Sequence, residues 1–339
     1  MDTAVVYQSD GRIRSQLLDR RERLERVIDQ RPPAADAQPL ERLLEEVDQA
    51  LARLEGGTFG VCEVCHGTIE GDRLETDPML RTCLECLTAA EQRALESDLD
   101  LAARVQRGLL PPPRLSLGGW EAAYRYEPAG TAGGDYVDLL PLDSGDLIFL
   151  VGDVSGKGVA ASLLMTHLHA IVRSLMDLQV PFAALAERVN RIFYETVGGQ
   201  QYVTLVCGKA SPDGELELSN AGHWPPVILR GGTSLTVPAT SVPIGLFANA
   251  PFPTIRTTLE PGQSVVVYTD GVTETVDGSE REYGIDRVLR TLCGQHQREV
   301  HDLLAACAAD VARFRGDARR RDDLTLFALR RNAPSGAGL

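Results

Sequence analysis

Four short segments of the chain place an aspartate among glycines or beside a second acid. They are Gly133-Gly134-Asp135, Gly152-Asp153-Val154-Ser155-Gly156, Thr269-Asp270-Gly271 and Asp322-Asp323. Each segment is typical of a strand end or a tight turn, so we expect all four to converge at one edge of a β-sandwich. Converged carboxylates repel one another unless a cation lies between them, and aspartates without histidine or thiolate favour Mg²⁺ or Mn²⁺. The pattern therefore predicts metal-dependent hydrolysis.

Two divalent ions held in this way are suited to attack on phosphorus. They lower the pKa of a water molecule and offset charge on the phosphoryl oxygens, so that no serine or cysteine nucleophile is needed. Taken singly, each aspartate has a simpler interpretation as a turn residue, because Asp-Gly and Gly-Asp are common turn dipeptides. The occurrence of all four together favours the metal site.

A second metal site is indicated by two CxxC knuckles, Cys62-Glu63-Val64-Cys65 and Cys83-Leu84-Glu85-Cys86. The 17 residues between them fall in the range for a four-cysteine zinc site. Four thiolates fill the tetrahedral sphere of Zn²⁺ and leave no position for a substrate, so we expect a structural zinc. A redox dithiol pair is the alternative, and it fits less well because the two knuckles mirror each other. His66 is expected to be a loop residue.

The elements around the knuckles are predicted to be helical. Residues 11–30 carry a loose apolar face, and the segment that begins near Pro39 repeats apolar residues at intervals of three and four. Together they predict an antiparallel hairpin over residues 1–55, with independent packing of the two helices as the alternative. Residues 88–110 repeat apolar positions as in a coiled-coil seam and predict a linker helix that joins a homodimer. Packing of that helix on the neighbouring domain is the other interpretation.

From Trp120 to Arg330 the sequence pattern changes. Short runs of β-forming residues are separated by turn residues and interrupted by two long helical stretches. Such a mixture predicts an α+β layered domain and not a doubly wound sheet. The strands are expected at 146–151, 202–209, 215–219, 226–229, 264–268 and 324–329, and the helical stretches at 159–196 and 298–314.

Composition limits the classes of partner. The chain has 339 residues and a formal net charge of −14, which argues against broad nucleic-acid binding. Its amino terminus lacks a signal-peptide core, and its apolar runs are too short to span a bilayer. We therefore expect a cytoplasmic protein with no membrane contact and no direct nucleic-acid contact.

Residues 55–86 resemble the DksA/TraR-type zinc finger. The resemblance rests on Glu55-Gly56-Gly57-Thr58-Phe59-Gly60-Val61 before the first knuckle, on Ile69, Arg73-Leu74 and Pro78, and on the second knuckle. Members of that family insert the acidic tip of a helical hairpin into RNA polymerase, and Asp36 is the acid that this chain offers there. The resemblance thus implies a possible polymerase contact, beside the interpretation of a signal-sensing or dimerising module.

Five motifs resemble the SpoIIE/RsbU-type serine phosphatases, the bacterial branch of the metal-dependent type 2C protein phosphatases. They occur in the family's order at 133–138, 152–158, 220–226, 268–274 and 322–325. The resemblance implies an αββα sandwich preceded by a helical hairpin, a four-cysteine zinc finger and a linker helix. The domains expected are a hairpin at 1–55, a zinc finger at 56–90, a linker helix at 91–112, a phosphatase domain at 113–331 and a disordered tail at 332–339.

The same resemblance assigns roles to the acids. Asp153 is expected to bridge two Mn²⁺ or Mg²⁺ ions, with the carbonyl of Val154 on one of them. Asp270 and Asp322 complete the other sphere, and Asp135 contacts metal directly or through water. Asp323 is the lesser partner of its pair, and Asp138 is expected to support the ligands. His223 is expected to shape the site, with general acid catalysis as the alternative.

The resemblance implies a phosphoserine/phosphothreonine protein phosphatase whose substrate is a phosphorylated STAS-type anti-sigma-factor antagonist, so that its activity controls a sigma factor. The zinc-finger module would regulate it. One alternative is a transcription regulator that binds RNA polymerase and uses the phosphatase domain as a sensor or scaffold. Another is a hydrolase of small phosphoesters. Eukaryotic type 2C enzymes hold phosphate with an arginine before the first acid, where this chain has Gly130-Thr131-Ala132.

Overall fold

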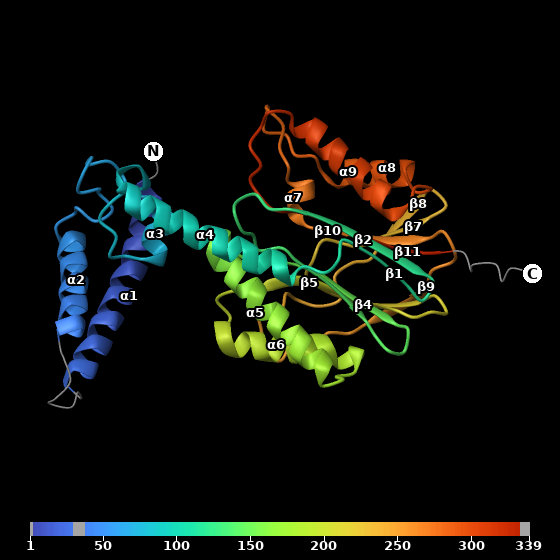
Figure 1. The fold of residues 1–339 in the computed structure, drawn as a ribbon, viewed down its shortest axis with the longest axis horizontal. Helices are drawn as coiled ribbons and strands as arrows, with labels where there is room; N and C mark the ends of the chain where they lie inside the picture. Colours follow the sequence, from blue (N-terminus) through green and yellow to red (C-terminus); the bar gives the residue numbers. More distant parts are fainter. Residues whose placement is uncertain (1–2, 30–37, 333–339) are drawn as a thin grey trace, which may run out of the picture. The chain divides into compact units, whose positions relative to one another are not determined.

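The computed structural model describes residues 3–29 and 38–332, which form two compact units that divide between Ser97 and Asp98 (Figure 1). The division falls inside a helix, α4 (Ala89–Leu109), within the expected linker. Asp36, the expected hairpin-tip acid, lies outside the described residues, as does the expected tail apart from Asn332.

The first unit begins with two long helices, α1 (Thr3–Asp29) and α2 (Gln38–Glu55). They run antiparallel, because the ion pairs Arg14–Glu55 and Arg21–Asp48 follow opposite orders along the two helices. The apolar repeat packs between them, where four residues are buried: Ile13, Leu17, Val47 and Ala50. The short helices α3 (Gly71–Thr76) and η1 (Leu84–Cys86) follow in the cysteine-rich segment.

The second unit contains two sheets whose neighbouring strands pair antiparallel. The first sheet has the order β1 (Arg114–Leu117), β2 (Trp120–Glu127), β11 (Leu324–Arg331), β10 (Ser264–Tyr268), β7 (Val227–Arg230) and β8 (Thr233–Thr236). The second has the order β3 (Tyr136–Pro141), β4 (Leu147–Val154), β5 (Val203–Ala210), β6 (Glu215–Ala221) and β9 (Ile255–Thr258).

The two sheets pack face to face, with helices on both outer faces. Residues Leu147, Phe149 and Val151 of β4 point into the core between the sheets, whereas Ile148 and Leu150 face the helices. This alternation explains why β4 reads as a continuous apolar run. The helices α5 (Gly158–Asp177) and α6 (Phe182–Val197) cover the second sheet, and α8 (Ile285–Gly294) and α9 (Val300–Arg315) cover the first (Figure 1). The predicted α+β sandwich of αββα type is confirmed.

Within the part of the chain that the structure describes, one helix is long and apolar enough to cross a membrane by length and composition, and it is α5. It buries Met165, Leu168 and Val172 in the core that it shares with the second sheet. Its apolar character is therefore that of a helix that covers a sheet.

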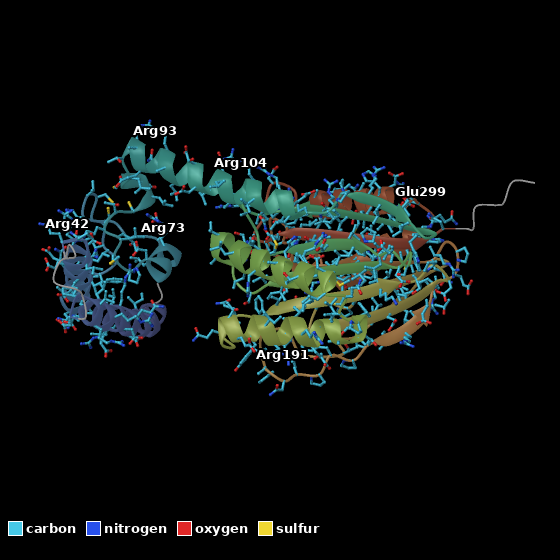
Figure 2. All side chains as sticks on the ribbon, turned by 60° about the horizontal axis from the view of Figure 1, so that its bottom comes forward. Arg42, Arg73, Arg93, Arg104, Arg191 and Glu299 are labelled. Carbon is cyan, nitrogen blue, oxygen red and sulfur yellow. The ribbon has the colours of Figure 1, made fainter. Side chains whose placement is uncertain are left out.

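The core between the sheets is centred on two aromatic rings. Phe149 of β4 and Phe327 of β11 stack with their centroids 4.9 Å apart, and both are fully buried (Figure 2 shows the side chains that fill this space). Gly208 of β5 makes room for them, because a Cβ there would lie 2.0 Å from the ring of Phe149. The stack therefore joins one sheet to the other.

Replacing Phe149 with alanine is expected to lower the free energy of unfolding by about 3–5 kcal/mol, because the cavity lies where neither sheet can collapse into it. Guanidinium unfolding of the full chain measures this loss. Leu178→Ala, at a side chain that is 73% exposed, serves as the control and should change stability by less than about 0.5 kcal/mol. Equal effects of the two substitutions would contradict the placement of Phe149.

Candidate metal centres

The predicted acids lie at strand ends in both sheets. Asp153 is the penultimate residue of β4, and Asp270 opens the short helix α7 (Asp270–Thr273) directly after β10. Asp322 precedes β11 by two residues. These three side chains line one cavity of about 280 Å³, together with Val154, Lys157 and a group of neutral residues: Ser155, Gly156, Tyr202, Thr204, Gly222, His223 and Trp224.

The electrostatics of this cavity are those of crowded carboxylates. Burial, followed by the charges of Asp270 and Asp322, raises the pKa of Asp153 to about 7. Burial, followed by Asp322 and Glu274, raises the pKa of Asp270 to about 6. Carboxylates that are both desolvated and mutually repelling are stabilised when a divalent cation lies between them. The donor set, oxygen atoms only, suits Mg²⁺ or Mn²⁺.

Asp135 lies just before β3 and is fully enclosed. Burial, followed by the charges of Asp153 and Asp323, raises its pKa well above the ordinary value. One of its oxygens, Oδ2, accepts hydrogen bonds from the hydroxyls of Thr269 (2.9 Å) and Thr325 (2.5 Å). Thr269 directly precedes Asp270, and Thr325 is the second residue of β11, so the two threonines tie the Asp135 loop to the end of β10 and the start of β11.

The neighbours Asp322 and Asp323 face different surroundings. Asp322 lines the cavity, whereas Asp323 accepts hydrogen bonds from the backbone N–H of Ala129 (2.8 Å) and of Gly134 (2.7 Å). A Cβ on Gly133 would lie 1.9 Å from the Asp323 carboxylate, so the glycine is required for this contact. Asp323 therefore holds the loop that leads to Asp135, and Asp322 is the member of the pair that is placed to bind a cation.

Lys157, a cation beside the acids, was not among the predicted site residues. Lys157 donates to the Asp322 carboxylate (Nζ to Oδ2, 2.6 Å) and to the carbonyl of Arg321 (3.0 Å). The only signal in the sequence was its place three residues after Val154, in the same glycine-rich motif as Asp153. Lys157 partly neutralises the acidic cavity and stands at its exposed rim, since its side chain is 67% exposed.

His223 lines the cavity as a neutral side chain. Burial lowers its pKa to about 4. Its Nδ1 lies 2.8 Å from the hydroxyl of Thr204, and its backbone N–H donates to the side chain of Asn220 (2.8 Å). These bonds hold the turn after β6 against β5, which is a shaping role.

Asp138 lies away from the acidic cavity. The expectation that it supports the metal ligands is wrong, because its hydrogen-bond partners belong to a different part of the domain. Its carboxylate is fully buried between β3 and α5, where it accepts two hydrogen bonds from Arg173 (2.9 and 2.5 Å) and one from Tyr136 (3.0 Å). None of these partners lines the acidic cavity. Asp138 instead joins a helix to a strand through an ion pair inside the domain.

The end of α4 reaches the Asp135 loop. Gln106 is 3% exposed, and its side chain makes two hydrogen bonds to one residue: Nε2 donates to the carbonyl of Gly133 (2.6 Å), and Oε1 accepts from the N–H of Gly133 (3.1 Å). In the sequence, Gln106 opens the segment Gln106 to Pro111, which is typical of the helix that enters a SpoIIE/RsbU-type phosphatase domain, but no contact could be assigned to it. This contact connects the helix that enters the domain to the segment before Asp135.

The four predicted cysteines converge in the first unit, and their Sγ atoms all lie within 4.8 Å of one another. The backbone N–H groups of Cys65 and Cys83 lower the pKa of Cys62 to about 6, whereas burial raises the pKa of Cys83 and the neighbouring thiols raise that of Cys86, so four thiolates together need a cation between them. The N–H of Gly67 points at the sulfur of Cys65 (3.4 Å). Four sulfurs at this spacing fit the tetrahedral sphere of Zn²⁺.

Across the described residues, the cysteines are the one group of three or more potential ligands that meets this 4.8 Å spacing, so no three of the acids approach one another as closely.

Three comparisons place the chain among known proteins. The family model described as stage II sporulation protein E (SpoIIE) matches residues 143–332, more than half of the chain. Protein IcfG of Synechocystis sp. is 25% identical over 264 residues, which cover 69% of this chain and 42% of IcfG. Phosphoserine phosphatase RsbU of Bacillus subtilis is 24% identical over 246 residues, which cover 71% of this chain and 72% of RsbU. The chain thus spans less than half of the length of IcfG.

A solved structure shares the fold. The SiaA-PP2C domain of Pseudomonas aeruginosa superimposes with a TM-score of 0.64 at 20% identity, over 72% of this chain and 98% of that domain. The fold, the order of the acidic motifs and the match of the family model agree. This chain belongs to the SpoIIE family.

Proposed function

We propose that the chain is a metal-dependent phosphatase that removes phosphate from phosphoserine or phosphothreonine in a protein. The observation that carries the proposal is the cavity in which carboxylates from the ends of both sheets face one another: Asp153, Asp270 and Asp322. RsbU, which carries the name phosphoserine phosphatase, is similar over most of its length and supports the same activity.

The residues fit a pair of Mn²⁺ or Mg²⁺ ions. Asp153 would hold both ions, the role that the family resemblance implies for it, because it lines the same cavity as Asp270 and Asp322. The carbonyl of Val154 would join one sphere, and Asp270 with Asp322 would complete the other. Asp135 would contact metal directly or through water, by way of the carboxylate oxygen that Thr269 and Thr325 leave unbonded, with Asp323 as the lesser ligand. When bound, the ions supply an activated water molecule and offset charge on the phosphoryl oxygens.

The chain's own residues hold the phosphoryl group and the acids in place. Lys157 is the cation at the cavity rim, and we assign it the phosphate contact that the family's eukaryotic relatives make with an arginine. Its ammonium donates to Asp322 and stands at the exposed rim, where a second acceptor such as a phosphoryl oxygen could also receive a hydrogen bond from it. Thr269 and Thr325 fix the orientation of Asp135.

The proposed substrate is a phosphorylated STAS-type antagonist of an anti-sigma factor, so that dephosphorylation alters sigma-factor activity. The proposed regulator is the first unit, with a structural zinc on Cys62, Cys65, Cys83 and Cys86. We further propose a homodimer through α4 and a cytoplasmic location. The domains that we propose are a hairpin at 1–55, a zinc finger at 56–90, a linker helix at 91–112 and a phosphatase domain at 113–331.

Phosphate release from a phosphorylated STAS protein, measured with full-length protein and Mn²⁺, tests this function. We expect a kcat/KM at least about 100-fold higher for the phosphoprotein than for p-nitrophenyl phosphate, because remote contacts contribute only with the protein substrate. Equal values for the two would favour a hydrolase of small phosphoesters. Absence of release from both would contradict the proposal.

Replacing Gln106 with alanine is expected to lower kcat about tenfold with Mn²⁺ present, because the loop before Asp135 loses two buried hydrogen bonds. The Mn²⁺ concentration for half activity should rise in the same variant, a change that a purely structural residue far from the acids would not cause. Arg107→Ala, at the exposed neighbour, is the control. Unchanged kcat and unchanged Mn²⁺ dependence in Gln106→Ala would show that the contact does not position Asp135.

A further inference from the structure

A second cavity, of about 230 Å³, adjoins the acidic one and shares Lys157 and Asp322 with it. Four arginines from the end of α9 and from the loop before β11 line it: Arg315, Arg319, Arg320 and Arg321. We call it the arginine cavity. A concentration of cations here contrasts with the net charge of −14 for the whole chain.

Two of these arginines already have carboxylate partners. Arg320 pairs with Glu127, and Arg321 pairs with Glu280 at 2.6 Å. For the described residues, no ion pair is found for Arg315 or Arg319. The Nε of Arg315 is also buried without a hydrogen-bond acceptor. A buried N–H donor without an acceptor is costly, and both arginines lack a carboxylate partner among the described residues, so the cavity is suited to receive an anion.

The acids in the wall do not cancel this charge. Glu274, Glu282 and Asp322 line the same cavity, against four arginines and Lys157. Glu274 and Glu282 are exposed to solvent, as are Arg319 and Arg321, so screening reduces charges of both signs, and the five cations still outnumber the three acids. A divalent ion on Asp322 would leave the wall more positive still.

We propose that the arginine cavity binds a carboxylate of the protein substrate, from an Asp or Glu that flanks the phosphorylated residue. The inference rests on the proposed function, because the shared wall places the carboxylate beside the phosphoryl group. Neighbouring residues of an extended peptide are spaced about 3.3–3.6 Å apart, so an acid within a few positions of the phosphoserine reaches the adjoining cavity. Arginine suits this role because its planar fork pairs with carboxylates in a bidentate manner.

Two phosphoserine peptides test the inference, one with Glu on both flanks and one with Gln at the same positions. With full-length protein and Mn²⁺, we expect the Glu peptide to have a kcat/KM about tenfold higher, mainly through KM. The double variant Arg315→Gln/Arg319→Gln should bring the two peptides within about twofold of each other, mainly by raising the KM of the Glu peptide. Arg298→Ala removes one exposed arginine at the other end of α9 and should keep the preference.

Peptide binding, measured by fluorescence anisotropy, separates this inference from the function on which it rests. Tighter binding of the Glu peptide by the wild type, lost in the double variant, supports the arginine cavity even if neither peptide is hydrolysed. A lack of hydrolysis would count against the phosphatase alone. Equal binding of both peptides by the wild type, or a preference that survives in the double variant, would overturn the inference.

Discussion

Asp153→Asn is expected to reduce metal-dependent phosphate release by about a thousandfold or more, because the bridging carboxylate would lose the charge that holds both ions. The same substitution should stabilise the metal-free protein. Burial and two neighbouring carboxylates raise the pKa of Asp153 to about 7, so its ionised form opposes folding. That cost is absent below the ordinary aspartate pKa near 4 and is complete above about 7.

Activity assays with Mn²⁺ and thermal unfolding in EDTA at pH 8 measure the two effects. In EDTA we expect the melting temperature of Asp153→Asn to rise by at least about 2 °C, the shift that roughly 1 kcal/mol produces in a domain of this size. Asp143→Asn, at an exposed acid in the turn after β3, should change neither quantity. A variant that is less stable than the wild type in EDTA would show that Asp153 has a structural role, and full activity would remove it from the proposed ligands.

Replacing Cys83 with serine is expected to abolish zinc binding and to unfold the cysteine-rich segment. Zinc on four thiolates contributes about 10–16 kcal/mol in small zinc modules, far more than the buried residues of this segment can replace. Elemental analysis should find one zinc per wild-type chain and none in the variant, and limited proteolysis should cut the variant between residues 56 and 90.

The second unit should stay folded in the same variant. Its apolar cores lie between its two sheets and between each sheet and the helices that cover it, so they do not include the cysteine-rich segment. Turnover of p-nitrophenyl phosphate should therefore persist in Cys83→Ser. Cys293→Ser, outside the cluster, is the control and should retain zinc. Loss of all turnover in Cys83→Ser, or zinc retained in it, would contradict the independence of the two centres.

The acidic motifs were predictable because each strand end carries its own local signal. Asp153 follows a run of buried residues, and Asp270 follows another, so their chemistry could be seen without knowing the pairing of the strands. Asp322 and Asp323 could not be separated in that way. They are adjacent in sequence, and the family resemblance alone ranked Asp322 first; the backbone N–H groups of a distant loop give the physical reason, because they already engage Asp323.

The strands that escaped prediction depend on distant partners. β2 pairs with β11, about 200 residues away along the chain, and its pattern is mixed with Glu121 and Arg125. β3 contains Asp138, a charge that interrupts an apolar run and is balanced by Arg173 of α5. The contacts of Lys157 and Gln106 could not be predicted for the same reason, because their partners, Asp322 and Gly133, lie far away in sequence.

The most direct test of the central claim is a Mn²⁺ titration of phosphate release from a phosphoserine protein, after the chain has been treated with a chelator that leaves the zinc in place. The cavity of three carboxylates predicts no release without added metal and a saturable rise with Mn²⁺, absent in Asp153→Asn. Release that is independent of added Mn²⁺, or equal in the wild type and Asp153→Asn, would contradict the account.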